Sequence, residues 1–300
     1  MLTGLRHNVR QVWAKIGRTF FAEEAIRRHV RPSRGIADPA VHMLVSSKTW
    51  HAGILAAVTF EHHSGRRWKF FIHDDGTLEK THRKRITDVF DDATIVDRAA
   101  ADARAREFLA GHPKCLDRRG RHNLFLKFSD FIAWTPGRRF IVLDSDVIFF
   151  RAPGEIVEWA ESGADTCHYN EDTKEKYCIP RAFIAERLGV EMWPRFNSGL
   201  VLLPSAAVSL ALSERLAVAF EDDAHHPQFF EQTLYGLMSS IWNRGGPLPS
   251  TYEISWGYLR RRHATCRHYV GDFKHDLLYI EGATSFWWRT CVLRKRANTL

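Results

Sequence analysis

The segment Phe140-Ile141-Val142-Leu143-Asp144-Ser145-Asp146-Val147-Ile148-Phe149-Phe150 places two carboxylates inside an otherwise apolar run. The apolar residues before Asp144 predict a buried strand over residues 139–143 that ends at this pair. Carboxylates in such surroundings are costly unless they meet a cation. Two oxygen ligands at a strand end suit Mg²⁺ or Mn²⁺ that also holds phosphate oxygens. Exposed turn aspartates are the alternative interpretation.

Strand-like and helix-like patterns alternate on both sides of this segment. Apolar runs predict strands over residues 41–46, 69–73 and 94–97, and helical spacing predicts helices over 50–63, 86–90 and 123–134. Residues 196–213 predict a strand, a turn at Pro204 and the start of a helix. Repeated strand–helix units indicate a mainly parallel α/β sheet, which holds ligands at the carboxyl ends of its strands. The phosphate-binding patterns GxxxxGK[ST] and GxGxxG are both missing from the sequence.

A second polar cluster lies far downstream, in His268-Tyr-Val-Gly271-Asp-Phe-Lys274. An imidazole nitrogen of His268 could complete a metal shell. Gly271 would let the backbone approach a phosphate, and Lys274 would neutralise charge on a diphosphate. By itself this cluster is also consistent with a loop histidine and a surface lysine. Together with Asp144 and Asp146 it predicts a clamp for a metal and a diphosphate.

Four motifs in this order resemble the glycogenin-like family of nucleotide-sugar transferases, glycosyltransferase family eight, which has the GT-A fold. The likeness spans roughly residues 41–282, and its motifs are Lys127 on a helix, Asp144-Ser145-Asp146, Asn197-Ser198-Gly199, and His268 with Gly271 and Lys274. It implies a single Rossmann-like GT-A domain over 38–285 with a mainly parallel central sheet. It also implies transfer of a sugar from a nucleotide diphosphate donor, UDP-sugar favoured, to a hydroxyl of a glycan or glycolipid.

The resemblance assigns roles to particular residues. Asp144, Asp146 and His268 would bind the divalent metal, and Lys127 and Lys274 would face the phosphates or sugar of the donor. Asn197 and Ser198 would line the sugar or acceptor pocket. The nucleotide would further be held by the ends of the first two strands and by the two metal motifs, which gives the candidate positions Val45, Ser46, Ser47, Asp74, Asp75, Ser145 and Gly271.

Glu231 and Gln232 match an Asp-Gln pair that in this family lies near the centre of sugar transfer. Glu231 replaces the aspartate, and the family's Lys-Pro-Trp ending is Lys274-His275-Asp276 here. These departures leave both retention and inversion of the anomeric centre open. Inversion requires a carboxylate base, for which Glu231 is the candidate ahead of Asp222 and Asp223. An ordinary residue of a helix N-terminus is the alternative for Glu231.

The net charge of +8 is concentrated in the two ends of the chain. Residues 1–37 hold eight basic and two acidic residues (8 − 2 = +6), residues 286–300 hold four basic residues, and residues 38–285 therefore carry 8 − 6 − 4 = −2. Residues 2–21 predict a basic amphipathic helix with its apolar stripe at Leu2, Leu5, Val9, Val12, Trp13, Ile16 and Phe20. The stripe could pack on the chain's own domain or a partner chain, or residues 1–35 could contact an anionic membrane. The basic tail 286–300 would follow the catalytic domain.

Composition sets the remaining expectations. Five cysteines without a CxxC pair indicate reduced thiols, and the sequence has neither a transmembrane pattern nor a signal peptide. We expect a cytoplasmic protein, with peripheral contact at the inner face of a membrane as the sharper interpretation. Two other functions stay open: a sugar-1-phosphate nucleotidyltransferase on a similar sheet, and a non-enzymatic protein whose basic ends bind nucleic acid. The catalytic interpretation includes no nucleic-acid partner, and the oligomeric state is open.

Overall fold

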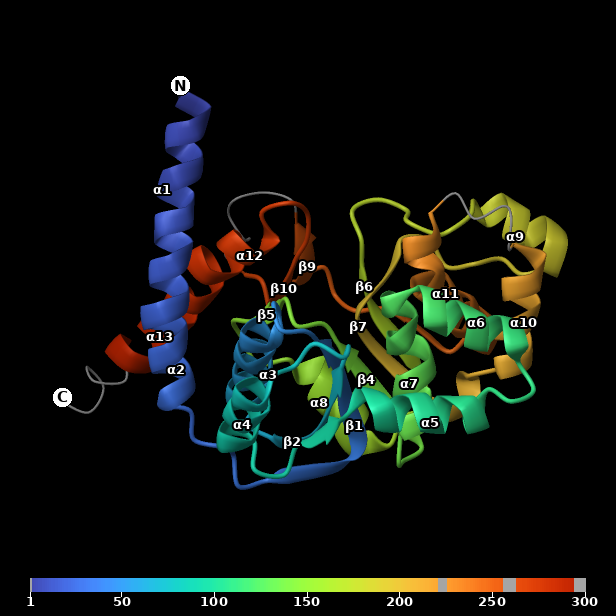
Figure 1. Ribbon diagram of the computed structural model, residues 1–300, viewed down its shortest axis with the longest axis horizontal. Coiled ribbons are helices and arrows are strands. Elements are labelled where there is room, and N and C mark those ends of the chain that lie inside the picture. Colours follow the sequence, from blue (N-terminus) through green and yellow to red (C-terminus); the bar gives the residue numbers. More distant parts are fainter. Residues whose placement is uncertain (1, 221–225, 256–262, 294–300) are drawn as a thin grey trace.

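The computed structural model describes residues 2–220, 226–255 and 263–293 and is built around a seven-stranded sheet (Figure 1). Its strand order is β3-β2-β1-β4-β7-β6-β8. The strands are β3 (Thr94–Val96), β2 (Arg67–Asp74), β1 (Gly35–Val45), β4 (Arg139–Leu143), β7 (Phe196–Pro204), β6 (Cys167–Glu171) and β8 (Gly245–Pro247). Only β7 runs antiparallel to its neighbours, β4 and β6. The predicted, mainly parallel α/β sheet is therefore confirmed.

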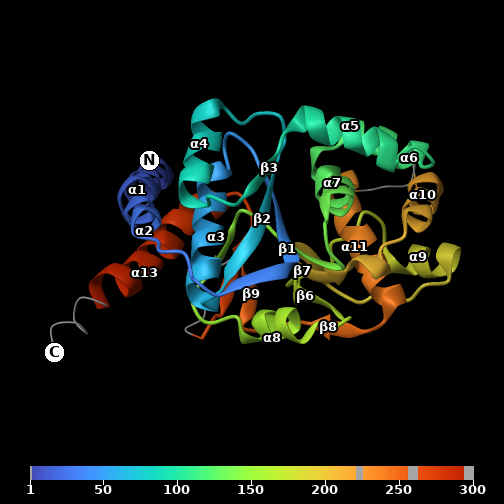
Figure 2. The same cartoon turned by 90° about the horizontal axis from the view of Figure 1, so that it is seen from below.

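Helices cover both faces of this sheet (Figure 2). One face packs against α3 (Trp50–Ser64), α4 (Lys80–Val89) and α8 (Gly154–Ser162), whose apolar side chains share a core with the strand residues Val41, Met43 and Leu143. The other face packs against α5 (Arg98–Phe108), α6 (Pro113–Arg121), α7 (Leu126–Trp134), α9 (Arg181–Leu188), α10 (Leu210–Ala219) and α11 (Phe230–Trp242). The central strands β4 and β7 are buried along their whole length, and apolar residues dominate their sequences.

A second, three-stranded sheet brings distant motifs together at the carboxyl edge of the first. It has the order β5-β10-β9, with β5 (Val147–Phe149), β10 (Cys266–Tyr269) and β9 (Tyr252–Ser255). β5 begins directly after Asp146, and its Val147 pairs with His268 of β10. This register carries His268 to the two aspartates although more than a hundred residues separate them in sequence.

The predicted N-terminal helix is present and packs on the C-terminal helices. A helical run of α1 (Leu2–Ile16), the π-helix η1 (Gly17–Ala22) and α2 (Glu23–Arg27) lies beside α12 (Lys274–Leu277), η5 (Leu278–Ala283), α13 (Thr284–Trp287) and η6 (Trp288–Leu293) (Figure 1). Gly17 allows the closest approach, because a Cβ there would overlap the main-chain carbonyl of Tyr279. The two ends of the chain thus form one packed layer.

Most of the N-terminal basic side chains are paired within the protein. Arg10 bonds Asp276, Arg27 and Arg28 bond Glu24, and Arg34 bonds Glu161. Arg31 joins Glu61, Asp91 and Asp92. The surplus that the sequence places in residues 1–37 is therefore largely used to hold this segment on its own domain.

Several predicted elements differ from the structure at their ends. The helix expected over 86–90 is α4, which begins earlier because Glu79 and His82 form a capping box at its start. The helix expected over 123–134 is a 3₁₀ turn, η2 (Asn123–Phe125), followed by α7. Two more 3₁₀ turns, η3 (Ser205–Ala207) and η4 (Pro227–Phe229), precede α10 and α11. β1 begins at Gly35, a few residues before the expected domain start at 38.

Candidate active site

Asp144, Asp146 and His268 form a compact cluster at the carboxyl edge of the central sheet. Asp144 follows β4, Asp146 precedes β5 and His268 belongs to β10. One candidate ligand atom from each residue lies within 4.8 Å of the others. Nε2 of His268 is 3.2 Å from Oδ1 of Asp146 and 3.8 Å from Oδ2 of Asp144. The structure therefore brings the three predicted metal ligands together.

The motif Asn197-Ser198-Gly199 on β7 orients this cluster. Oδ1 of Asn197 lies 3.1 Å from Nδ1 of His268 and can accept its proton, which orients the ring so that Nε2 faces the aspartates. Gly199 makes room for the ring, because a Cβ at that position would overlap the imidazole of His268. The same Oδ1 accepts the backbone N–H of Gly199 at 2.9 Å. The amide of Asn197 and the missing side chain of Gly199 are therefore both needed to place His268.

The donor set fits a divalent cation. Oδ1 of Asp146 is buried and makes no hydrogen bond within the described part of the chain, which is costly unless a cation faces it. Burial alone would raise the pKa of Asp146, but the nearby His268 and Lys274 outweigh it and hold that pKa well below its usual range. Asp146 is thus a carboxylate at neutral pH, and two carboxylates with one imidazole suit Mn²⁺ or Mg²⁺.

Lys127 on α7 is a buried cation beside the same cluster. Its Nζ lies 2.8 Å from Oδ1 of Asp144 and 3.0 Å from Oε1 of Glu231. Burial would lower its pKa, but these two carboxylates raise it above the ordinary value, so the side chain stays charged. Buried ammonium groups persist only with such partners. Tyr235 fixes the helix beneath it by donating to the carbonyl of Lys127 at 2.6 Å.

Glu231 and Gln232 lie at the start of α11 and tie that helix to β7. Oε1 of Glu231 accepts from the hydroxyl of Ser198 at 2.7 Å, and Oε1 of Gln232 accepts the backbone N–H of Ser198 at 3.2 Å. Nε2 of Gln232 donates to the carbonyl of Lys176 at 2.6 Å. Glu231 therefore orients Lys127 and Ser198, while its role as a proton acceptor stays a prediction. The other base candidates, Asp222 and Asp223, fall outside the described residues.

Lys274 pairs with Asp146, whereas Lys127 pairs with Asp144. Its Nζ is 2.6 Å from Oδ2 of Asp146, whose negative charge raises the pKa of Lys274. Gly271 has a φ of 89°, a conformation that glycine adopts without strain, and its carbonyl accepts the N–H of Lys274 at 3.2 Å. The turn after β10 thus returns the lysine to the edge where His268 lies.

The positions predicted for the nucleotide lie along the same edge, at the ends of β1 and β2. Val45 is buried, Ser46 and Ser47 are half-buried, and Ser145 packs against the start of α3 near Gly53. The carboxylate of Asp74 is already committed: Oδ1 accepts the N–H groups of Gly76, Thr77 and Leu78, and Oδ2 pairs with Arg83. Asp75 bonds the hydroxyl of Thr77 at 2.6 Å. Asp74 therefore shapes the turn after β2, and contact of either aspartate with nucleotide stays a prediction.

Asp172 belongs to the site although the sequence analysis did not single it out. It is buried, and its Oδ2 accepts from Nδ2 of Asn197 at 3.0 Å with Nζ of Lys176 at 3.6 Å. Asp172 thus fixes the amide that orients His268. It also lines a surface hollow of about 420 Å³ together with Glu171, Thr173, Arg195, Leu248, Pro249, Ser250, Tyr252, Glu253 and Ile254. Its signal in the sequence is the polar stretch 169–176 between Cys167 and Cys178.

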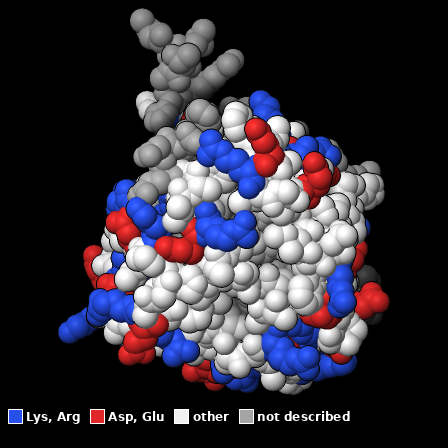
Figure 3. All heavy atoms as spheres, turned by 90° about the vertical axis from the view of Figure 1, so that its right-hand side faces the viewer, with Lys and Arg blue, Asp and Glu red and all other residues white. Residues whose placement is uncertain are grey.

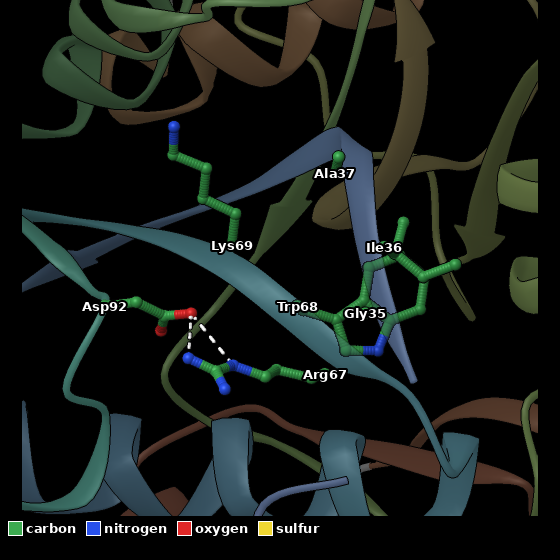
Figure 4. A pocket seen from close by; sticks show the side chains of 7 residues that line it. All are labelled: Gly35, Ile36, Ala37, Arg67, Trp68, Lys69 and Asp92. Atoms are coloured by element: carbon green, nitrogen blue, oxygen red, sulfur yellow. Dashed lines mark hydrogen bonds and ion pairs between the residues drawn. The ribbon is translucent and has the colours of Figure 1, made fainter. Parts of the chain in front are cut away.

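A further hollow of about 370 Å³ lies at the amino ends of β1 and β2, away from the metal cluster (Figure 4). It is lined by Gly35, Ile36, Ala37, Arg67, Trp68, Lys69 and Asp92. Its charged residues Arg67 and Asp92 pair with each other, because Nε of Arg67 donates to Oδ2 of Asp92 at 3.0 Å. The hollow is thus separate from the chemistry described above.

The chain has the fold of the GT-A glycosyltransferases. The galactosyltransferase LgtC, solved in complex with donor and acceptor sugar analogues, matches with a TM-score of 0.55 and 15% identity over 87% of this chain and 100% of that one. Apo mouse xyloside xylosyltransferase 1 matches with a TM-score of 0.51 and 13% identity over 76% of this chain and 96% of that one. GlyE of Streptococcus pneumoniae TIGR4 matches with a TM-score of 0.50 and 11% identity over 90% of this chain and 64% of that one.

These identities are low, so the likeness establishes the fold. The predicted GT-A architecture is thereby confirmed, whereas the particular family within that class stays a prediction. The sequence matches no model of a known protein family. It is also not significantly similar to any curated protein sequence.

Proposed function

We propose that this protein is a metal-dependent glycosyltransferase that moves a sugar from a nucleoside diphosphate donor, UDP-sugar favoured, to a hydroxyl of a glycan or glycolipid. The observation that carries the proposal is the cluster of Asp144, Asp146 and His268 between two lysines, Lys127 and Lys274. The GT-A fold supports it, since the cluster lies at the carboxyl edge of the strands, where sheets of this kind hold their ligands.

The residues of this chain suit departure of a nucleoside diphosphate. Mn²⁺ or Mg²⁺ held by Asp144, Asp146 and His268 would supply a Lewis acid for the diphosphate oxygens. Negative charge grows on the leaving group as the glycosidic bond breaks, and Lys274 is placed to stabilise that charge more in the transition state than in the ground state. Lys127 forms an ion pair with Asp144 and so fixes the position of that carboxylate. Loss of one such group should lower the rate roughly 10²–10³-fold.

The acceptor would enter beside β6 and β7. Asp172 and Asn197 connect the metal cluster to the hollow of about 420 Å³, whose lining mixes charged groups with the apolar Leu248 and Ile254. Such a lining fits a sugar, which offers both hydroxyls and apolar ring faces. Glu231 is the carboxylate proposed to take up the acceptor proton if the reaction inverts the anomeric centre.

On the face that Figure 3 shows, the charge pattern does not favour nucleic acid as the partner. On the face around α9 and α10, lysine and arginine alternate with aspartate and glutamate among uncharged side chains (Figure 3). At the N-terminal end, five arginines are paired with acids of the same chain. Nucleic-acid binding instead requires a continuous basic surface whose affinity falls steeply with salt.

Calorimetric titration of UDP tests the proposal directly. We expect Mn²⁺ or Mg²⁺ to strengthen UDP binding to the native chain, and Asp146→Ala to abolish this enhancement. Asp165→Asn, an exposed change away from the cluster, is the control and should behave like the native protein. Equal UDP affinity with and without metal in the native chain would overturn the metal-dependent proposal.

Product analysis then separates the reaction classes. UDP-, GDP- and dTDP-sugars are incubated with metal, and the released nucleotide and the anomer of the sugar are identified. Release of a nucleoside diphosphate supports glycosyl transfer, and the anomer distinguishes retention from inversion. A nucleotidyltransferase would instead consume a nucleoside triphosphate and a sugar-1-phosphate and release pyrophosphate.

A further inference from the structure

The apolar stripe of the N-terminal helix faces outward. Val9, Val12, Trp13 and Phe20 are 50%, 57%, 55% and 57% exposed, and Ile16 is 38% exposed. They lie on one side of the α1–η1 run, which stands at the edge of the molecule beside the C-terminal helices (Figure 1). A surface helix normally turns its apolar stripe toward the core of its own domain, so this arrangement is the reverse of the usual one.

The opposite face of the same helix is the one that is fastened down. Ala14 and Gly17 are buried, and Gly17 touches the main chain at Tyr279. Nε of Arg10 donates to Oδ2 of Asp276 at 2.7 Å, and its guanidinium lies 3.6 Å from the centre of the Phe273 ring. These contacts fix the rotation of the helix about its axis. The stripe is therefore held outward by the fold.

Aromatic rings extend this surface at the foot of the helix. The ring centre of Phe20 is 6.1 Å from that of Trp287, which lies 6.4 Å from that of Trp288. Trp288 is 52% exposed. Tryptophan and phenylalanine are favoured at the boundary between lipid headgroups and acyl chains. We call the exposed residues Val9, Val12, Trp13, Ile16, Phe20 and Trp288 the outer apolar surface.

Lys15 flanks the outer apolar surface, and Arg18 lies on the side of the helix toward Tyr279. Lys15 and Arg18 are exposed, and neither makes an ion pair among the described residues, although the other N-terminal arginines named above are paired. Arg18 is 5.9 Å from the ring centre of Tyr279. Exposed cations next to an apolar helix face match an anionic lipid surface. In the described residues, no helix is long and apolar enough to span a bilayer.

From these observations we infer that the outer apolar surface docks the protein on an anionic membrane, with the α1–η1 run lying in the plane of the headgroups. Trp13, Phe20 and Trp288 would enter the boundary region, while Lys15 contacts anionic headgroups and Arg18 adds positive charge near the membrane surface. The helix stays attached to α12 through Arg10, so the segment that carries Lys274 is brought next to the bilayer. This inference does not depend on which sugar is transferred.

Co-sedimentation of the full chain with lipid vesicles tests it. We expect binding to phosphatidylcholine vesicles that contain about one-third phosphatidylglycerol, and much weaker binding to pure phosphatidylcholine. The double change Val12→Ser/Trp13→Ser should weaken binding to the anionic vesicles by at least about 10-fold. Val218→Ser removes an equally exposed valine from α10 and should bind like the native chain.

The charge contribution is separated by a second pair of variants. Lys15→Gln/Arg18→Gln should weaken binding to anionic vesicles, and added salt should weaken native binding in the same direction. Lys80→Gln/Arg106→Gln removes the same charge from exposed sites on α4 and α5 and should have little effect. Thermal unfolding and UDP titration of each variant verify that its fold and donor site are intact.

A second copy of the chain is the competing occupant of this surface. Sedimentation velocity distinguishes it, because a dimer would form with rising protein concentration and without lipid. The membrane inference is overturned if three results are found together: the native chain dimerises, Val12→Ser/Trp13→Ser abolishes the dimer, and the native chain does not bind vesicles. Equal vesicle binding by the native chain and Val12→Ser/Trp13→Ser would overturn it as well.

Discussion

Arg10 and Asp276 are 266 positions apart in the chain, yet Nε of Arg10 donates to Oδ2 of Asp276 at 2.7 Å. The guanidinium also lies over the ring of Phe273. Phe273 and Asp276 flank Lys274, whose Nζ is 2.6 Å from Oδ2 of Asp146. Arg10 of the first helix therefore contacts residues on both sides of Lys274 in the sequence. These contacts link the N-terminal segment to the donor site.

We expect Arg10→Ala to weaken UDP binding in the presence of Mn²⁺ by about 3–10-fold, or roughly 0.7–1.4 kcal/mol. The variant frees the segment around Lys274 without removing a group that touches the donor, so Arg10 is a positioning residue. Arg10→Lys keeps the charge and should recover part of the affinity. Isothermal titration at constant ionic strength provides the measurement.

Two comparisons make this result specific. Arg27→Ala removes an exposed arginine from the same helical run and should leave UDP affinity unchanged. Lys274→Ala should weaken binding more than Arg10→Ala does. If Lys274→Ala matters and Arg10→Ala does not, the link between helix and site is wrong while the proposed function survives.

Gly199 is the residue whose substitution should act on the metal through His268. A methyl group at this position overlaps the imidazole ring, so Gly199→Ala should displace Nε2 and weaken Mn²⁺ binding by about 10–100-fold. Manganese titration followed by electron paramagnetic resonance measures this change. Gly120→Ala serves as control, because a Cβ there meets nothing within 4 Å and Gly120 lies in helix α6. Native-like manganese affinity in Gly199→Ala would contradict the role of the glycine.

Asp172 should influence the metal from a distance. Asp172→Asn removes the charge that holds Nδ2 of Asn197 and permits the amide to turn, so that Nδ1 of His268 loses its acceptor. We expect weaker Mn²⁺ binding, within about 10–100-fold, and a smaller effect than for Asn197→Ala. An unchanged manganese affinity in both variants would show that the amide does not orient His268. Asp165→Asn is again the matched control.

His42 and His73 should make the stability of the fold depend on pH. Both are fully buried between β1, β2 and α7, with Nδ1 of His42 at 2.9 Å from Nε2 of His73. Burial lowers the pKa of His42 to about 3 and that of His73 well below its ordinary value. Below pH 6.5 the unfolded chain therefore binds more protons than the folded one. The stabilisation is complete above pH 6.5 and is lost as the pH falls from 6.5 toward 3.

Urea unfolding between pH 5 and pH 7.5 measures this slope. As the pH falls, the free energy of unfolding should decrease less steeply in His42→Phe/His73→Phe than in the native chain. The two slopes should differ by about 2 kcal/mol per pH unit, since each of the two protons contributes at most about 1.4 kcal/mol per pH unit. Val142→Ala, in the same layer, should lower stability equally at every pH. A slope identical to that of the native chain would contradict the prediction.

The sequence predicted five of the seven strands of the main sheet, and missed β6 and β8, whose residues form no apolar run. β4 is apolar after its first residue, Arg139, and its predicted and observed bounds coincide. The start of α4 was missed because residues 80–85 carry no apolar spacing, and capping by Glu79 and His82 defines that end instead. The spacing of residues 2–21 predicted the helix, but the face that packs is decided by Arg10, Ala14 and Gly17 against segments near the other end of the chain.

The metal cluster was also predictable, since its three residues follow recognisable motifs. The roles of the residues that support the cluster, Asn197 and Asp172, could not be predicted, because these roles depend on strand register. Asn197 was expected to line a sugar pocket, which stays a prediction, and its contact with His268 was not foreseen. Asp172 reaches Asn197 where the pairing of β6 with β7 is irregular. The bonds of the Asp74 carboxylate within the turn after β2 were not foreseen either, and its contact with nucleotide stays a prediction.

The first helix packs on segments near the other end of the chain, and this arrangement has a consequence for biosynthesis. At about 5–20 residues per second, the ribosome needs roughly 13–50 seconds to add the residues that separate Arg10 from Asp276. During that interval residues 2–22 lack the C-terminal surface on which they pack, and a helix formed there would expose both of its sides. A nascent chain in this state would offer a substrate to chaperones or to a membrane. Completion of the donor site would thus be one of the last events in folding.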